Sequence, residues 1–353
     1  MKKVLKIILI LLLVIVLAVL GLLAWLSITE YKPEAVEVLE IFGGSDHRAI
    51  SSENEIKILC WNIGYGGLGK ESDFFMDGGK ESRAADKEQV IEYLESIKAT
   101  VDENSPDLLL LQEVDSDSGR SYRIDQRTYF GSSDDSSAYA MNYACDFVPI
   151  PLPPIGRVHS GLYTVSYGYE IESAERTSLP CPFTWPMSTA NLKRCLLVSY
   201  LPIEGSDKQL VLVNLHLEAY DDGEGKIAQT NQLRQFIEAE YGKGNYVIAG
   251  GDFNQVFPGG LEAYPNEHPE LWTPGILQDD ILPEGWSFAY DLSAPSCRLL
   301  NQPYNPADTA NTQHYVIDGF ILSPNVTVNQ VECLDLGFES SDHNPISLSV
   351  TLN

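Results

Sequence analysis

The chain has 353 residues and a formal net charge of −27 at pH 7, from 50 acidic and 23 basic side chains. Affinity for a nucleic-acid backbone comes mainly from Lys and Arg, so this composition disfavours nucleic acid as the main partner without excluding a nuclease. None of the six cysteines stands in a C-x-x-C pair, which argues against a structural zinc site.

The N-terminus has the pattern of a membrane anchor. Its first 26 residues carry three lysines and no acid, and residues 7–26 carry no charge. A helix needs about 20 apolar residues to cross a bilayer. A cleaved signal peptide is the alternative, but its apolar region is usually about 7–15 residues and a small-x-small site follows it. The lysines favour a cytoplasmic N-terminus.

We therefore expect a single-pass membrane protein with most of its chain outside the cytoplasm. The expected parts are a short cytoplasmic end (1–6), a transmembrane helix (7–26), a linker (27–54) and a large domain (55–353). The acidity of that domain repels anionic headgroups, so the helix and not surface charge would hold it at the membrane.

The domain alternates strand-like runs with two helical patterns. Apolar runs bounded by Gly, Pro, Asn and Asp predict strands, whereas apolar residues recurring every three or four positions predict helices. Helices are predicted at 82–103 and 226–241. Strands are predicted at 56–63, 107–114, 160–166, 193–203, 209–217, 245–251, 315–323, 326–336 and 345–352. Many strands and few helices in mixed order predict an α/β (α+β) sandwich of two sheets with helices outside.

The cysteines divide into two groups. Cys60, Cys195 and Cys333 lie in apolar strand-like runs and are interpreted as buried thiols. Cys145, Cys181 and Cys297 can pair in an oxidising compartment, but spacing alone does not reveal the pairing. The oligomeric state is likewise left open.

Polar side chains follow the apolar runs at several predicted strand ends. Each has an ordinary structural explanation, such as a turn, a surface acid or a helix cap. Buried carboxylates and imidazoles are costly unless they are paired or bound to metal, so the set together favours a shared site. The set consists of Asn62, Glu113, His216, Asp252, Asn254, Asp318, Asp342 and His343.

These residue types suit phosphoester chemistry. Glu113 and Asn62 offer the oxygen ligands that Mg²⁺ or Mn²⁺ prefers, and such a metal polarises a phosphoryl oxygen. Asp318 can orient His343, and Asp252 can position and deprotonate a water. Asn254 and His216 can then donate hydrogen bonds to phosphate oxygens.

The ordered motifs WNIG, LQEV, NLHLE, GGDFNQ, IDGFI and SSDHNPIS resemble the endonuclease/exonuclease/phosphatase superfamily. The resemblance covers about residues 56–352 and implies a four-layer sandwich of two mixed sheets with helices outside. It also implies roles for the set: Glu113 and Asn62 match metal-site positions, and Asp342 matches an acid that touches metal in some members. The positions that match catalytic or supporting residues are His216, Asp252, Asn254, Asp318 and His343.

The sequence departs from the superfamily at Gly64, where some nucleases carry an acid, and this puts a second metal ligand there in doubt. Two basic residues are candidates for contacts with the substrate: Lys80, at the end of a glycine-rich loop, and Arg194. The segment VPIPLPPIG, residues 148–156, either contacts lipid or serves as a rigid connector packed on the domain.

Together these observations predict a membrane-anchored, metal-dependent phosphoesterase. A nuclease is the first alternative, disfavoured by the scarcity of Lys and Arg. The second alternative is an inactive binding module, which the retention of Glu113, Asp252 and His343 disfavours. The substrate stays open, because one fold and one catalytic set serve many phosphate esters.

Overall fold

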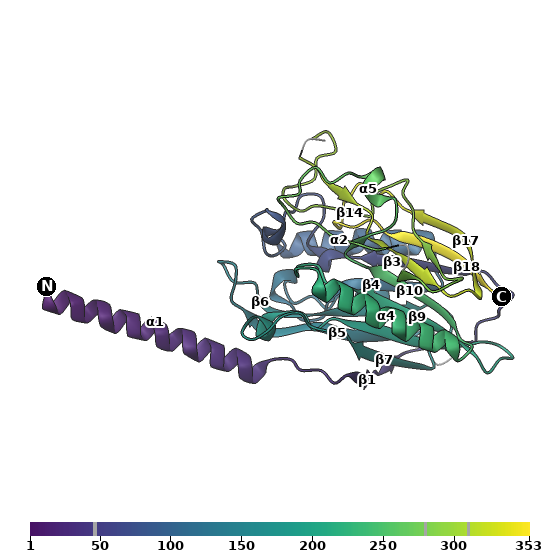
Figure 1. The fold of residues 1–353 in the computed structure, drawn as a ribbon, viewed down its shortest axis with the longest axis horizontal. Helices are drawn as coiled ribbons and strands as arrows, with labels where there is room; N and C mark the ends of the chain where they lie inside the picture. Colours follow the sequence, from purple (N-terminus) through teal and green to yellow (C-terminus); the bar gives the residue numbers. More distant parts are fainter. Residues whose placement is uncertain (45–47, 279–280, 309–310) are drawn as a thin grey trace.

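The computed structural model describes residues 1–44, 48–278, 281–308 and 311–353. Two seven-stranded sheets lie face to face with α2 (Lys87–Asn104) and α4 (Glu224–Gly242) outside them (Figure 1). The other helices are α1 (Lys2–Thr29), α3 (Arg127–Phe130) and α5 (Gly260–Ala263). Short 3-10 turns occupy Gly64–Gly66, Phe75–Asp77, Gly119–Ser121 and Met187–Ala190. The predicted two-sheet sandwich is confirmed.

Both sheets are mixed. In spatial order, the first sheet contains β1 (Val36–Val38), β7 (Ser173–Ser178), β8 (Cys195–Pro202), β9 (Gln209–His216), β10 (Tyr246–Asp252), β16 (Asp318–Leu322) and β13 (Ser287–Ala289). The second contains β17 (Val326–Cys333), β18 (Ile346–Leu352), β3 (Ile56–Asn62), β4 (Leu108–Asp115), β6 (Gly156–Ser166), β5 (Ser136–Val148) and β2 (Ile41–Phe42). Two small ladders pair β11 (Gln255–Val256) with β12 (Gly275–Ile276), and β14 (Cys297–Arg298) with β15 (His314–Tyr315).

Side-chain alternation along the strands builds a core on each face of a sheet. On β9, Leu210 and Leu212 face the opposite sheet, where they join the central core. Val211 and Val213 point to the other face and pack with Leu233 of α4. Strands covered on both faces are mostly apolar, which is why the sequence shows nearly continuous apolar runs here.

The helix α2 covers the outer face of the second sheet. Asp86 caps its N-terminus by accepting a hydrogen bond from the backbone N–H of Gln89 at 2.8 Å. Val90, Leu94 and Ile97 recur at helical spacing and are buried on that sheet. The predicted helices at 82–103 and 226–241 therefore correspond to α2 and α4.

A register shift interrupts β4 near its end. The ladder with β6 shifts between Leu111 and Val114, and both of these side chains stay on the face covered by α2. Gln112 points between the sheets, where it donates a hydrogen bond to Asn214 at 2.7 Å. Glu113 has a left-handed backbone with φ of 55°. The shift thus frees Glu113 from the ladder while the strand on both sides remains packed.

The segment 27–54 differs from the expected spacer. It contributes β1, which pairs with β7, and β2, which pairs with β5, so it extends one edge of each sheet. Ile50 is fully buried in the central core. All six cysteines lie in the described part of the chain, and none of them forms a disulfide.

The helix α1 projects from one end of the sandwich, whereas the C-terminus lies at the opposite end (Figure 1). By length and composition it can cross a membrane, although an N-terminal signal sequence meets the same criterion. Its last turns contact the domain: Leu26 is buried with Cys145, Val148 and Val158 of β5 and β6.

Candidate active site

Three of the predicted residues lie side by side on adjacent strands of the first sheet. Asp252 ends β10, and its register partners are His216 on the parallel strand β9 and Asp318 on the antiparallel strand β16. Parallel strands end at the same edge of a sheet, and β16 begins at that edge. The topology therefore brings the three side chains together from positions distant in sequence.

The second sheet supplies Asn62 and Glu113 from the ends of β3 and β4. The side chain of Asn62 crosses between the sheets, and its Nδ2 donates a hydrogen bond to Asp252 Oδ2 at 3.0 Å. The same nitrogen lies 3.5 Å from Glu113 Oε1. Asn62 Oδ1 accepts a hydrogen bond from the backbone N–H of Gly64 at 3.1 Å. The site therefore joins the ends of both sheets.

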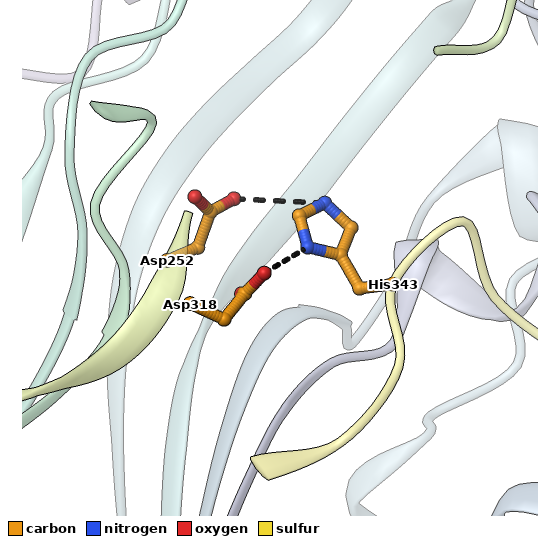
Figure 2. A group of neighbouring side chains, drawn as sticks. All are labelled: Asp252, Asp318 and His343. Atoms are coloured by element: carbon orange, nitrogen blue, oxygen red, sulfur yellow. Dashed lines mark hydrogen bonds and ion pairs between the residues drawn. The ribbon is translucent and has the colours of Figure 1, made fainter. Parts of the chain in front are cut away.

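His343 is held between two aspartates (Figure 2). Its Nδ1 lies 2.8 Å from Asp318 Oδ2, and its Nε2 lies 3.8 Å from Asp252 Oδ2. Ser296 Oγ donates to the same oxygen of Asp318 at 2.7 Å. Trp61 Nε1 fixes the backbone by donating to the carbonyl of His343 at 2.8 Å. The arrangement orients the imidazole with Asp318 on one side and Asp252 on the other.

His216 and Asn254 complete the surroundings of Asp252. The Nε2 atom of His216 lies 3.4 Å from Asp252 Oδ2, and its buried Nδ1 has no hydrogen-bond partner among the described residues. Asn254 has a left-handed backbone with φ of 50°, and its N–H donates to Asp252 Oδ1 at 2.8 Å. Its side chain donates to the carbonyl of Leu217 at 2.9 Å. Asp252 is therefore positioned through both of its oxygens.

Burial and neighbouring charges separate the proton affinities of these groups. Burial lowers the pKa of His343, but the charges around it, Asp318 foremost, outweigh burial and hold this pKa well above its ordinary value. Burial, with Arg194 and His343 nearby, holds the pKa of His216 well below its ordinary value. Burial also raises the pKa of Asp252. At neutral pH the site thus pairs a protonated His343 with a neutral His216.

These side chains surround a cavity of 470 Å³. Asn62 and Asp318 do not line it: Asp318 lies behind His343, and Asn62 lies behind Asp252 and Glu113. Lys80 does not line it either, and its side chain is exposed. The predicted residues that line the cavity are Glu113, Arg194, His216, Asp252, Asn254, Asp342 and His343.

The sequence profile described as the endonuclease/exonuclease/phosphatase family matches residues 59–343, which is more than half of the chain. The chain belongs to the endonuclease/exonuclease/phosphatase family. No curated protein matches its sequence significantly. The predicted family membership is confirmed.

Several solved structures share the fold. An endonuclease/exonuclease/phosphatase from Beutenbergia cavernae DSM 12333 matches with a TM-score of 0.54 and 15% identity, over 85% of this chain and 72% of that one. A family protein from Bacteroides thetaiotaomicron gives 0.53 and 14%, over 85% and 98%. The human Nocturnin catalytic domain, with bound sulfate, gives 0.51 and 17%, over 89% and 98%. At such identities the likeness is one of fold.

Members of this family are typically metal-dependent, and two carboxylates in the cavity have the chemistry that a divalent cation requires. Among the described residues, the side-chain partners of Glu113 are distant: Asn62 Nδ2 at 3.5 Å and Arg120 at 4.0 Å. Asp342 accepts a hydrogen bond from Ser341 Oγ at 3.4 Å. Burial raises the pKa of Asp342 to about 6, and the charge of Glu113 adds to the shift. Two weakly partnered acids that repel each other fit a cation between them.

A second group of donors also meets the distance requirement for a cation. One ligand atom each from Asp252, Asp318 and His343 lies within 4.8 Å of the others. In this group Asp318 Oδ2 already lies 2.8 Å from His343 Nδ1 and accepts a hydrogen bond from Ser296 Oγ at 2.7 Å. Two members of this Asp–Asp–His group, Asp318 and His343, are therefore already paired with each other.

The structure adds cavity residues that the motifs did not reveal. Asp77 accepts a hydrogen bond from Tyr220 Oη at 2.9 Å, and both line the cavity. Arg120 pairs with Asp115 at 2.9 Å, and its guanidinium lies 3.8 Å from the ring centre of Tyr65. Of these cavity residues, Tyr220 lies close in sequence to a predicted site residue, four positions after His216.

Proposed function

We propose that the chain is a membrane-anchored, divalent-metal-dependent phosphoesterase that hydrolyses a phosphodiester or phosphomonoester. One observation carries the proposal. His343, fixed by Asp318 at 2.8 Å, faces Asp252 inside a cavity whose lining also includes Glu113 and His216. This constellation combines a charged imidazole, a carboxylate of raised pKa and a neutral imidazole around one space.

Asp252 is the proposed general base. Its raised pKa brings it close to neutral pH, where a general base works best. Asn62 and the backbone of Asn254 orient its carboxylate, so that a water in the cavity can be positioned and deprotonated. The water oxygen then attacks phosphorus, the ester P–O bond breaks, and the leaving alcohol takes a proton from solvent.

The two histidines act on the phosphate. The protonated His343 donates from Nε2 to a phosphate oxygen, and Asp318 keeps it oriented and charged. His216 and Asn254, which also line the cavity, donate further hydrogen bonds to phosphate oxygens. Preorganised donors of this kind stabilise charge that develops in the transition state without rearranging when it forms.

Asn62, Glu113 and Asp342 are the residues proposed to hold Mg²⁺ or Mn²⁺. Such an ion, when bound, polarises a phosphoryl oxygen and offsets its charge. The two carboxylates supply hard oxygen ligands, and Asn62 links this corner of the site to the base, Asp252. Arg194 remains a proposed substrate contact. Lys80 remains one only for a substrate that reaches beyond the cavity.

A nuclease finds less support from the site. The guanidinium groups of Arg120 and Arg194, which line the cavity, are paired with Asp115 and Glu218. They offer little free positive charge to a nucleic-acid backbone. An inactive binding module finds less support still, because most of the polar set lines one cavity and the rest, Asn62 and Asp318, bonds to residues that line it.

The location is part of the proposal. We infer that α1 remains attached as a single membrane span with its lysine-rich end in the cytoplasm. The domain would then lie outside the cytoplasm. Protease protection of the full chain in sealed vesicles, read with tags at each end, tests this orientation.

Hydrolysis of bis-p-nitrophenyl phosphate by the purified full chain tests the activity. We expect turnover with Mg²⁺ or Mn²⁺, loss of turnover with chelator, and loss in His343→Ala and Glu113→Ala. A panel of phosphomonoesters and phosphodiesters extends the assay. Metal-independent turnover, or variants as active as wild type, would falsify the proposal.

A further inference from the structure

The catalytic cavity reaches the last turns of α1. Besides Asp252 and His343, the residues lining it include Leu23 and Leu26 of the helix. Leu26 is buried against Val148 and its neighbours on β5 and β6. The candidate membrane helix is therefore part of the wall of the catalytic cavity.

Polar contacts fix the end of α1 on the domain. Trp185 Nε1 donates to Ser27 Oγ at 2.9 Å. Lys193 Nζ pairs with Glu30 Oε1 at 2.9 Å, and neither side chain is more than 13% exposed. Both contacts come from the connection between β7 and β8, whose residues also line the cavity. The cavity mouth therefore has a set position relative to the helix.

That position corresponds to the outer edge of a bilayer. The uncharged run at residues 7–26 rises about 1.5 Å per residue, so it spans about 30 Å, the thickness of the hydrocarbon core. Leu23 and Leu26 belong to the last turn of this run. The helix leaves the domain at the end where β5 and β6 are joined (Figure 1). The cavity thus reaches the depth at which lipid chains meet their headgroups.

Exposed apolar side chains gather near the same end. Ile150 and Met187 line the cavity and are 58% and 57% exposed, and Leu152 and Trp185 are 86% and 61% exposed. Exposed apolar groups that cluster together mark lipid or partner contacts, and Trp is enriched at membrane interfaces. The segment 148–156 therefore has the exposure that lipid contact requires, with Val148 packed on the domain.

We propose that the substrate is a lipid phosphate ester of the membrane that α1 spans. Its phosphate lies at His343 and Asp252, and its aliphatic part lies along Leu23 and Leu26. Water adds to phosphorus, the ester P–O bond breaks, Asp252 takes the proton of the water, and the leaving alcohol takes a proton from solvent. This inference rests on the proposed phosphoesterase activity and names its substrate class.

The first experiment compares chain length at a fixed headgroup. The full chain is reconstituted with Mg²⁺ in phosphatidylcholine vesicles that contain long-chain phosphatidate or phosphatidylglycerol. Turnover of each lipid is compared with that of its water-soluble short-chain homologue. We expect the long-chain form of at least one lipid to have a higher kcat/KM by about tenfold or more. Equal turnover of both forms, or a mononucleotide turned over as well as the lipid, overturns the proposal.

The second experiment changes the helix wall without changing its hydrophobic character. Leu23→Trp puts a larger, still apolar side chain into the cavity. Leu20→Trp makes the same change at a helix position that is 56% exposed. We expect Leu23→Trp to lower the ratio of lipid turnover to bis-p-nitrophenyl phosphate turnover by about tenfold. Leu20→Trp should leave this ratio unchanged.

The controls separate the two proposals. If wild type hydrolyses neither bis-p-nitrophenyl phosphate, a diester, nor p-nitrophenyl phosphate, a monoester, the proposed function itself fails. If wild type hydrolyses either ester but no long-chain lipid, or if Leu23→Trp leaves the ratio at its wild-type value, only the lipid proposal fails.

Discussion

The side chain of Asn62, at the end of β3, donates a hydrogen bond across the sandwich to Asp252, at the end of β10, over 3.0 Å. This bond joins the two sheets at the site. It also connects the proposed metal corner at Glu113 with the proposed base. The position of the base therefore depends on how the two sheets pack against each other.

The first prediction concerns this bond. Asn62→Ala leaves a buried carboxylate oxygen with one donor fewer, so kcat should fall on the order of 10- to 100-fold. Asn62→Asp places a second carboxylate beside Asp252, which raises the pKa of Asp252 further and moves the acid limb of the pH–rate profile upward. Asn329→Ala, on the exposed face of β17, is the control. An unshifted profile in Asn62→Asp would contradict the assigned base.

The second prediction concerns the orientation of His343. Asp318→Asn removes the charge that keeps the pKa of His343 high, so the alkaline limb of the pH–rate profile should move to lower pH. The maximal rate should fall on the order of 10²- to 10⁴-fold with little change in KM. Asp207→Asn, in the exposed turn between β8 and β9, is the control. A change confined to KM would argue that Asp318 only maintains local structure.

The third prediction concerns metal binding. Glu113→Gln keeps the shape of the side chain and removes one charge, so the Mg²⁺ concentration for half-maximal rate should rise on the order of 10- to 100-fold. Titration of Mn²⁺ followed by electron paramagnetic resonance measures the same loss without turnover. Glu204→Gln, an exposed acid, serves as control. Unchanged Mn²⁺ affinity would argue that the metal binds at Asp252, Asp318 and His343 instead.

The fourth prediction concerns Asp77, which is buried next to Tyr220. Burial raises its pKa to about 7 from an unfolded value of 3.8, so the native state keeps its proton in the window between them. Its contribution to stability is complete below the unfolded pKa and is lost as pH rises through about 7. Asp77→Asn stays neutral throughout and lacks this loss. The free energy of unfolding of the variant minus that of wild type should therefore increase on the order of 2–3 kcal/mol between pH 5 and pH 8.

Urea unfolding of the full chain in detergent and chelator at both pH values measures this difference. The exposed Asp222→Asn serves as control and should follow wild type at both values. A constant difference between Asp77→Asn and wild type across the window would mean that Asp77 is already ionised in the native state.

Much of the candidate site could be proposed from the sequence because several of its residues, such as His216, follow apolar runs. Asn62, Asp252 and Asp318 stand at strand ends or starts, and sheet topology brings such positions together. The bond between Asp77 and Tyr220 was not predictable in this way. Those residues are 143 positions apart, and neither stands at the end of a strand-like run.

The strands β1, β2, β5 and β7 were not predicted from the sequence, because their local pattern does not indicate a strand. Two of them, β1 and β2, are three and two residues long, too short for any period to show. The polar strand β7 (SAERTS) takes its place from pairing with β8 over six residues. The long strand β5 has two register shifts against β6, which blur its alternation. Tertiary pairing, and not local pattern, determines these elements.

The left-handed backbone of Glu113 has a further consequence, for the balance between stability and activity. A non-glycine residue held there costs on the order of 1–3 kcal/mol, and the packed residues on both sides of it in β4 maintain the conformation. Glu113→Gly should relieve this strain and make the fold more stable than wild type, while Glu113→Gln should keep it. The substitution that stabilises the fold at this position also removes a proposed metal ligand. Selection for stability alone would therefore replace Glu113, whereas selection for catalysis would keep it despite the strain.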